Sequence, residues 1–301
     1  MSTNKKQLAL IGLLTILGCK TAQQNRNYQA AFPAFSAEAH RGGRGLMPEN
    51  TILAMYNAMK YERVTTLEMD THISKDNQVV VTHDDYLSPT FMLTPQGKDI
   101  PKSDSKKYAI YQMDYSLIRS FDIGTKPNPG FPTQTKIKTY LPLLAELIDS
   151  VQLEIKRKNL KPYFYNIETK CDVAGDGITN PAPDVFVKLL MEVIQSKNIT
   201  PFVVIQSFDK RTIQLIHQKY PKVKTSFLVE TKQPYERYMA ELGYKPFILS
   251  PKSSFVDAEL VQKAHADGVK VIPWTANTPE EIARLKALKV DGIISDFPNL
   301  L

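Results

Sequence analysis

The sequence predicts an α/β fold in which eight strand–helix units close into a (β/α)8 TIM barrel. From residue 37 onward, short β-branched stretches alternate with amphipathic ones, which is typical of a parallel sheet covered by helices. Eight such strands in about 260 residues match the length and strand count of this barrel. Polar motifs follow several strands, where barrel enzymes hold their active sites. A doubly wound open sheet has the same local pattern, so alternation alone does not separate the two folds.

The individual elements are expected at regular intervals. Strands are predicted near residues 36–40, 64–69, 163–168, 202–206, 224–229, 246–249, 269–273 and 291–295. Helices are predicted near residues 49–62, 141–158, 183–197, 209–219, 234–242, 256–267 and 278–288. Asp209 and Thr278-Pro279 are suitable helix starts, and Gly243 and Gly268 lie where C-terminal glycines of helices belong. Only five residues follow Asp296, too few for an eighth helix.

Two segments interrupt the alternation after the second strand. Residues 71–83 predict a small hairpin, with Lys75-Asp76-Asn77 as its turn and Val79–Val81 as its second strand. Residues 84–140 are rich in Pro, Lys, Asp and Gly, and long loops of this kind are usually functional. We interpret this segment as an elaborated loop on the active-site rim, with a short helix near residues 114–119.

The N-terminus has the pattern of an export signal. Lys5 and Lys6 precede an apolar run from Leu8 to Leu17, and this run is shorter than the roughly 20 residues that span a bilayer. Ile16-Leu17-Gly18-Cys19 resembles the lipobox of bacterial lipoproteins, in which the cysteine becomes the acylated first residue; a plain signal peptide is the alternative. We therefore predict an exported, membrane-anchored lipoprotein that faces the periplasm or the cell exterior. The predicted division is a signal peptide over 1–18, a tether over 19–36 and a barrel over 37–301.

Charge and cysteine content restrict the function classes. The formal charge is +7, and without residues 1–18, which contain two lysines and no acid, it is +5. This surplus suits an anionic substrate or membrane surface, or it is a solvated face without a partner. No basic run with interleaved aromatic residues supports nucleic-acid binding. If Cys19 is lipidated, Cys171 is the remaining thiol, which excludes an intramolecular disulfide and a cysteine-based zinc site.

The first of four polar clusters at strand ends is HRGGRGLMPENT, residues 40–51. A glycine-rich turn into a helix forms an anion-binding corner, where backbone amides and Arg41 face a phosphate while His40 transfers a proton. A strand-end histidine that is merely hydrogen-bonded is the ordinary alternative.

The second cluster is Glu68-Met69-Asp70. Residues two apart in a strand point to the same side, so both carboxylates reach one point at the barrel mouth. They repel each other unless a cation lies between them, and oxygen ligands favour Mg²⁺ or Ca²⁺. Surface acids near Lys75 or Arg63 are the alternative.

The third and fourth clusters add complementary groups. Thr82-His83-Asp84-Asp85 places a second histidine on the same rim, which makes an acid–base pair with the first one conceivable. In Asn166-Ile167-Glu168-Thr169-Lys170, Glu168 and Lys170 share a face, so they suit a metal site and a bound phosphate. Each cluster alone has an ordinary explanation, such as an exposed Glu/Lys pair. Their combination at successive strand ends favours an active site.

These motifs resemble those of the glycerophosphodiester phosphodiesterases. Residues 40–51 are similar to that family's opening motif, which is His-Arg-Gly, five residues, then Pro-Glu-Asn-Thr. LEMDTHISKDNQVVVTHDD at 67–85 resembles its Glu-x-Asp and downstream His-Asp segment, and IETK at 167–170 its third acidic motif. Its later strand-end motifs are matched by QSFD at 206–209, PWTAN at 273–277 and DGIISDFP at 291–298. The resemblance spans residues 37–301.

The resemblance implies hydrolysis of a small-molecule glycerophosphodiester to glycerol 3-phosphate and an alcohol. The attacking group is either water or the glycerol 2-hydroxyl. The implied ligands of a divalent metal, Mg²⁺ or Ca²⁺, are Glu68, Asp70 and Glu168. The implied acid and base, in either order, are His40 and His83, and the implied phosphate-binding residues are Arg41 and Lys170. Near the glycerol or leaving group, the implied pocket residues are Trp274 and Phe208, although Phe208 equally suits packing at the barrel top.

Other functions stay open at this point. A barrel phosphodiesterase that acts on intact phospholipid or on a sugar or opine phosphodiester has the same motifs, and the long segment 84–140 leaves substrate choice undecided. A non-catalytic lipoprotein that binds phosphorylated ligands is disfavoured, because the two histidines and three acids are all present. A structural envelope protein makes no use of the strand-end clusters.

Overall fold

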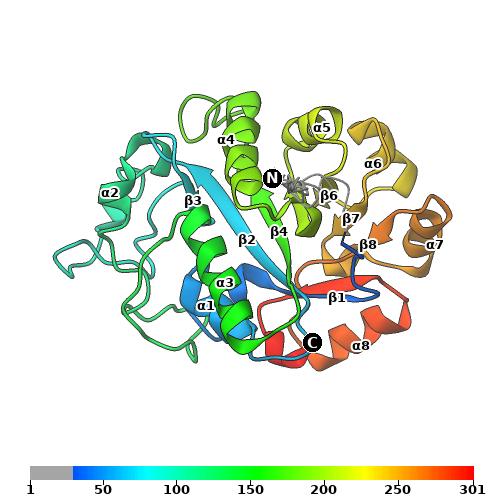
Figure 1. The fold of residues 1–301 in the computed structure, drawn as a ribbon, viewed down its shortest axis with the longest axis horizontal. Coiled ribbons are helices and arrows are strands. Elements are labelled where there is room, and N and C mark those ends of the chain that lie inside the picture. The colour runs from blue at the N-terminus through cyan, green and yellow to red at the C-terminus, as the bar shows by residue number, and fades with distance from the viewer. Residues whose placement is uncertain (1–29) are drawn as a thin grey trace, which may run out of the picture. The chain divides into compact units, whose positions relative to one another are not determined.

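The computed structural model describes residues 30–301 and confirms the predicted barrel (Figure 1). In this part of the chain, parallel strands follow one another in the sheet order β8-β7-β6-β5-β4-β2-β1-β9. Their bounds are β1 Ser36–Ala39, β2 Thr66–Ile73, β4 Phe164–Thr169, β5 Val203–Ser207, β6 Lys224–Val229, β7 Ile248–Pro251, β8 Lys270–Val271 and β9 Gly292–Ser295. All eight lie close to the predicted positions.

Isolated backbone hydrogen bonds connect β8 and the residues after it to β9 and the residue before it, and they complete the ring. Asp291 N donates to Val271 O over 2.9 Å, and Ile294 N donates to Pro273 O over 3.0 Å. Because β9 also pairs with β1 in parallel register, the sheet curls back on its first strand. This closure excludes the doubly wound open sheet, which the local sequence pattern left possible.

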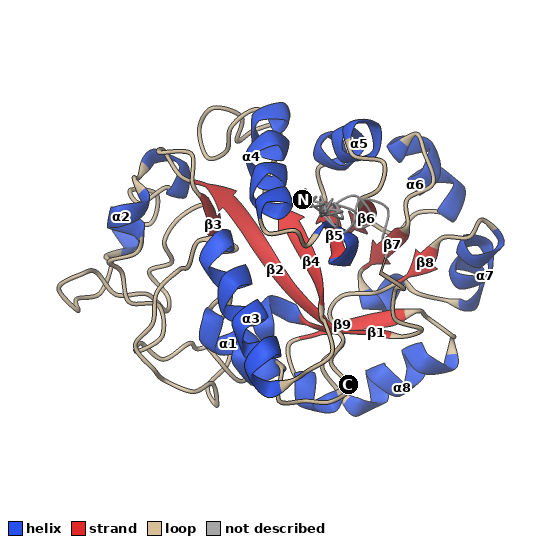
Figure 2. Cartoon of the chain, in the orientation of Figure 1, coloured by secondary structure: helices blue, strands red, loops and turns tan. Residues whose placement is uncertain are grey.

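Helices surround the strands (Figure 2). Their bounds are α1 Ile52–Ala58, α3 Leu144–Lys158, α4 Pro183–Ser196, α5 Lys210–Lys219, α6 Tyr235–Leu242, α7 Ala258–Ala266 and α8 Pro279–Ala287. As predicted, the side chains of Asp209 and Thr278 accept N-terminal backbone hydrogen bonds of α5 and α8, and Gly243 ends α6 in the left-handed conformation. The first helix is shorter than expected, because Pro48–Asn50 form a turn in which Asn50 has φ 58°.

The predicted hairpin extends β2 beyond the barrel. β3 (Val79–Val81) pairs antiparallel with the end of β2, with Thr71 opposite Val81 and Ile73 opposite Val79. The turn closes through a 3.0 Å hydrogen bond from Asn77 N to Ser74 O. This hairpin carries the chain toward the mouth of the barrel and positions the residues after Val81 there.

The segment 84–140 has a small hydrophobic core of its own. It contains α2 (Tyr115–Ile118), which matches the short helix expected near residues 114–119. Its later part contacts the loop after β1, since Gln134 Nε2 donates to Arg44 O over 2.7 Å. The segment therefore borders the loop at the end of β1. The residues of this second core are Val80, Leu87, Met92, Ile100, Ile110, Met113, Ile118, Phe121, Ile123 and Leu141.

Residues 1–29 lie outside the described residues, and with them the predicted signal peptide, Cys19 and most of the predicted tether. From residue 30 to residue 301, no helix is both long enough and apolar enough to cross a bilayer. The division of the chain into signal peptide, tether and barrel stays a prediction.

Candidate active site

The structure brings together the three acids that the sequence singled out. Glu68 and Asp70 lie on β2 and Glu168 on the adjacent β4, where Asp70 is paired with Glu168 in the sheet register. One carboxylate oxygen from each residue lies within 4.8 Å of the others, and all three side chains are buried. We call Glu68, Asp70 and Glu168 the acidic cluster.

Hydrogen bonds hold two members of the acidic cluster in place. Arg41 N donates to Glu68 Oε2 over 2.6 Å, and Gln206 Nε2 donates to Glu68 Oε1 over 2.8 Å. Asn50 Nδ2 donates to Asp70 Oδ2 over 2.9 Å. Among the described residues, the buried Asp70 Oδ1 has no hydrogen-bond partner. A buried carboxylate oxygen without a partner needs a compensating group, and hard cations bind carboxylate oxygens, so the donor set fits Mg²⁺ or Ca²⁺.

Charge is unevenly balanced within the acidic cluster. Burial raises the pKa of Glu68 well above its ordinary value, and the Asp70 charge adds to this shift. Burial also raises the pKa of Glu168 to about 7, although the Lys170 ammonium opposes it. Burial disfavours ionisation of Asp70 as well, but Arg41 holds the pKa of that carboxyl far below its ordinary value. The negative charges of Glu68 and Glu168 are therefore incompletely compensated, and a bound cation would supply the missing positive charge.

The two basic residues predicted at the site contact these acids. Arg41 is buried, with Nε 3.2 Å from Asp70 Oδ2 and Nη1 2.8 Å from Glu49 Oε1. Lys170 Nζ lies 3.0 Å from Glu168 Oε1. Both cations are thus held beside the acidic cluster, where a phosphate bound to a cation would meet them.

His40 is held by a carboxylate that lies at the other end of the described chain. Its Nδ1 lies 2.5 Å from Asp296 Oδ1, and Asp296 also accepts hydrogen bonds from Arg44 Nε and Asn277 Nδ2, both over 2.7 Å. Burial lowers the pKa of His40 to about 4, so the imidazole is neutral at pH 7. A neutral imidazole that donates Nδ1–H to a carboxylate keeps Nε2 as a proton acceptor.

His83 lies on the rim just after β3. Its Nδ1 lies 2.7 Å from Asp84 Oδ1, and its side chain is 30% exposed. The backbone there is held by His72, whose buried Nε2 lies 3.0 Å from His83 O. His83 is thus accessible on a backbone that the core of the hairpin fixes.

A cavity of about 100 Å³ joins the two histidines to the acidic cluster. Its lining includes Arg44 and Leu228 besides the predicted His40, Arg41, Glu68, His83, Glu168, Phe208 and Trp274. The Phe208 and Trp274 rings meet edge to face with centroids 5.3 Å apart, and Trp274 Nε1 donates to Ser250 O over 3.0 Å. Phe208 is 37% exposed, so it forms an open wall of the cavity rather than a packed barrel top.

Several residues of the site were not predicted individually, although each lies in a quoted motif. Glu49 pairs with Arg41, Asn50 bonds Asp70, Gln206 bonds Glu68, and Asn277 bonds Asp296. The alternation of β5 was a usable signal for Gln206, since it points to the same side as Phe208. The partners of Asn50, Gln206 and Asn277 lie in other motifs, so one motif alone did not assign these residues, whereas Glu49 and Arg41 lie in the same motif.

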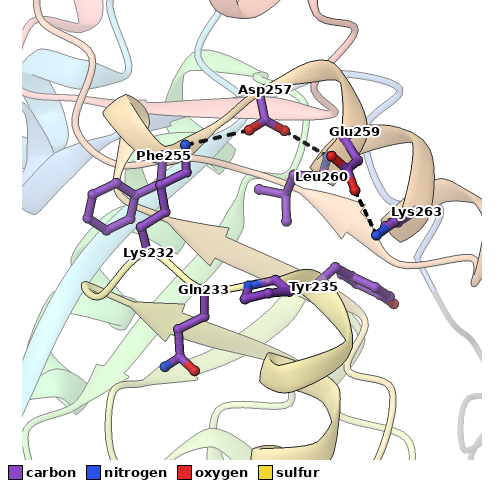
Figure 3. Close-up of a pocket in the computed structure, with 9 residues that line it drawn as sticks. Lys232, Gln233, Tyr235, Phe255, Asp257, Glu259, Leu260 and Lys263 are labelled. Atoms are coloured by element: carbon purple, nitrogen blue, oxygen red, sulfur yellow. Dashed lines mark hydrogen bonds and ion pairs between the residues drawn. The ribbon is translucent and has the colours of Figure 1, made fainter.

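A separate hollow of about 300 Å³ lies beside the starts of α6 and α7 (Figure 3). Lys232 faces Asp257 at 3.6 Å, and Lys263 faces Glu259 at 2.8 Å. These charges are compensated within the hollow, and none of the predicted site residues lines it.

Comparison with known proteins supports a family assignment. The model of the glycerophosphoryl diester phosphodiesterase family matches residues 40–300. A glycerophosphodiester phosphodiesterase of Bacillus subtilis is 27% identical over 297 residues, which cover 96% of this chain and 93% of that protein. A human lysophospholipase D is 25% identical, with 87% of this chain and 83% of that protein covered.

Solved structures show the same fold. A putative glycerophosphoryl diester phosphodiesterase from Silicibacter pomeroyi is 27% identical with a TM-score of 0.77, covering 89% of this chain and 92% of that one. A phosphodiesterase from Oleispira antarctica, solved with its product sn-glycerol-3-phosphate, has a TM-score of 0.68 at 22% identity and covers 87% of this chain and 93% of that one. The chain thus belongs to the glycerophosphoryl diester phosphodiesterase family, and its class of activity is that of a phosphoric diester hydrolase.

Proposed function

We propose that the chain hydrolyses glycerophosphodiesters to glycerol 3-phosphate and an alcohol with the help of Mg²⁺ or Ca²⁺. The observation that carries this proposal is the acidic cluster, in which three buried carboxylates within 4.8 Å include one oxygen without a partner among the described residues. The Bacillus subtilis relative, which bears the name of this activity, supports the substrate class. The product in the Oleispira antarctica complex is glycerol 3-phosphate, which agrees with the bond that we expect to be cleaved.

The residues present would hold a divalent cation through Glu68, Asp70 and Glu168. When bound, such a cation supplies positive charge that polarises a phosphoryl oxygen. Arg41 and Lys170 add two fixed positive charges beside that position, where negative charge develops during the reaction. A phosphate bound in the cavity would have both histidines and the acids Glu68 and Glu168 in its lining.

The two histidines have different surroundings, which suggests different roles. His40 is neutral and donates Nδ1–H to Asp296, so its Nε2 takes the proton of the attacking hydroxyl. His83 lines the same cavity and protonates the departing alkoxide. Phe208 and Trp274 form the wall beside them and exclude water from part of the reacting centre.

A coupled glycerol 3-phosphate assay on purified residues 20–301 tests this function. The panel contains glycerophosphocholine, glycerophosphoethanolamine and glycerophosphoglycerol, each with and without chelator. Lysophosphatidylcholine is assayed in parallel by release of choline, because its hydrolysis yields choline and lysophosphatidate and no glycerol 3-phosphate. We expect turnover of at least one glycerophosphodiester, loss of this turnover in chelator, and recovery with Mg²⁺ or Ca²⁺. Turnover of the lysophospholipid alone would indicate a phospholipid substrate. Unchanged rates in chelator would refute the role of a metal in catalysis.

We also propose that the protein is exported and anchored by lipid on Cys19. The support is the sequence pattern of Lys5 and Lys6, the apolar run Leu8–Leu17, and Gly18-Cys19. An acylated Cys19 would hold the barrel at a membrane surface.

A further inference from the structure

A buried carboxyl group lies in the barrel below the active site, and no step proposed above uses it. Glu38 is on β1, two residues before His40, and its side chain is completely buried. Burial of a carboxyl group is costly unless hydrogen bonds compensate it. Ser36 Oγ donates to Glu38 Oε1 over 2.9 Å, and Asn166 Nδ2 donates to Glu38 Oε2 over 2.8 Å.

Glu38 is connected to the acidic cluster through two amides. Asn166 Nδ2 also donates to Gln206 Oε1 over 3.0 Å, and Gln206 Nε2 donates to Glu68 Oε1 over 2.8 Å. Asn166 and Gln206 are 1% and 2% exposed. We call Glu38, Asn166 and Gln206 the polar relay.

The polar relay has a direction, which Glu38 determines. Oε2 of Glu38 accepts the hydrogen bond from Asn166 Nδ2, so Asn166 turns its NH2 group toward Glu38. The same NH2 group then meets the oxygen of Gln206, and this leaves the NH2 group of Gln206 to face Glu68. With no acceptor at position 38, the side-chain amide of Asn166 is free to flip, which exchanges the positions of its oxygen and its NH2 group. Gln206 would follow and place its oxygen against the Glu68 carboxylate, where two acceptors repel.

Glu68 needs this donor to keep its orientation. Its other oxygen is held by Arg41 N at 2.6 Å, so the two contacts together fix the plane of the carboxylate. Groups that hold a ligand in this way contribute about 10–100-fold to metal affinity in proteins. A substitution at position 38 is therefore expected to change the affinity of the metal site, although Glu38 itself does not touch the acidic cluster.

We propose that Glu38 is a positioning residue that acts through Asn166 and Gln206 to orient Glu68 for the divalent cation. The proposal rests on the metal role assigned to the acidic cluster above. It adds a determinant of metal affinity that lies below the site, in the interior of the barrel.

Titration calorimetry of Mg²⁺ and Ca²⁺ on the purified full chain tests the proposal without an activity readout. Glu38→Leu removes the acceptor and is expected to raise the Kd by about 10–100-fold. Glu38→Gln can turn its oxygen toward Asn166 and its NH2 group toward Ser36, so its Kd should stay within about threefold of wild type. Ser36→Ala is the matched control, because it removes the contact to the other oxygen of Glu38 and leaves the polar relay intact.

A double-mutant cycle separates the polar relay from a general loss of packing. Gln206→Leu cuts the relay next to Glu68, so adding Glu38→Leu should raise the Kd by less than about twofold more. Asn166→Ala breaks the middle link and provides the same comparison if Glu38→Leu fails to fold. Independent, multiplicative effects of Glu38→Leu and Gln206→Leu would overturn the proposal, and so would a Glu38→Leu Kd within threefold of wild type. Absence of binding in the wild type would instead refute the metal site itself.

Discussion

His40 and Asp296 are 256 residues apart, yet their Nδ1 and Oδ1 atoms lie 2.5 Å from each other. The sheet register explains this contact, because Ala39 of β1 is paired with Ser295 of β9 and each site residue follows directly. The contact therefore depends on the parallel pairing of the first strand, β1, with the last strand, β9.

Asp296→Asn should lower kcat by about 10²–10⁴-fold with little change in KM. A neutral amide at this position lacks the carboxylate charge that stabilises the imidazolium formed when His40 takes a proton, so the proposed base is weakened. Steady-state kinetics with a glycerophosphodiester measures the loss. Asp291→Asn, at the other end of β9, is the control, since it pairs with His265 and Lys270 away from the site. A loss smaller than about fivefold in Asp296→Asn would contradict the role of this contact.

Glu168→Gln should stabilise the metal-free protein at pH 8 while it abolishes stabilisation by Mg²⁺ or Ca²⁺. Burial raises the pKa of Glu168 to about 7, so its ionised form is unfavourable there by on the order of 1–3 kcal/mol. Urea unfolding in chelator and in excess cation measures both effects. Glu192→Gln, an exposed carboxyl on α4, changes the net charge equally and should leave both quantities unchanged. Equal cation-dependent stabilisation in Glu168→Gln and wild type would remove Glu168 from the metal site.

The pH dependence of stability should reveal the buried Glu38. Burial raises the pKa of this carboxyl from 4.5 to about 7, so the folded state binds the proton more tightly than the unfolded state. Its favourable contribution is complete below pH 4.5 and is lost as the pH rises through about 7. Relative to Glu38→Gln, the wild type should therefore lose on the order of 1–3 kcal/mol between these limits. Chemical unfolding of both proteins in chelator across this range checks the slope, and a pH-independent difference would be inconsistent with it.

Gly42→Ala should lower the free energy of unfolding by about 2–4 kcal/mol. Gly42 has φ 76°, and a Cβ there would lie 2.7 Å from Ala54 Cβ and 3.0 Å from the backbone of α1. Gly243→Ala is the matched control, since Gly243 has φ 82° but open space around it. In Gly243→Ala, the free energy of unfolding should fall only by the cost of the left-handed conformation, which is about 1–2 kcal/mol. Similar losses in the two variants by urea unfolding would show that the contact with α1 is unimportant.

Cys19→Ser should release the protein from membranes. If Cys19 carries the lipid, wild type takes up labelled palmitate and sediments with membranes, whereas Cys19→Ser does neither and stays in the supernatant. Cys171→Ser is the control, because Cys171 is buried in the barrel and should leave fractionation unchanged. Membrane sedimentation of Cys19→Ser without detergent would refute the anchor.

Local pattern in the sequence was sufficient for the elements and for part of the site. Strand alternation placed Glu68 with Asp70, and Glu168 with Lys170, on shared faces, because side chains in a strand repeat every two residues. Capping residues such as Asp209 and Thr278 marked helix starts for the same local reason. These two pairs could therefore be expected from the local pattern, and the resemblance to the family implied that Glu168 joins the acids of β2.

What only the tertiary structure decided depends on strand order and register, which local patterns do not encode. Pairing of β1 with β9 places Asp296 against His40. The Asp296 carboxylate then accepts a hydrogen bond from Nδ1–H of the imidazole. The contact between Gln206 and Glu68, and its connection through Asn166 to the buried Glu38, required four strands, β1, β2, β4 and β5, to meet inside one ring. The segment 84–140 is ordered by a hydrophobic cluster whose members are far apart in sequence, so no periodicity revealed it. Local strand geometry determines which side chains face inward. Long-range packing determines which of these side chains contact each other.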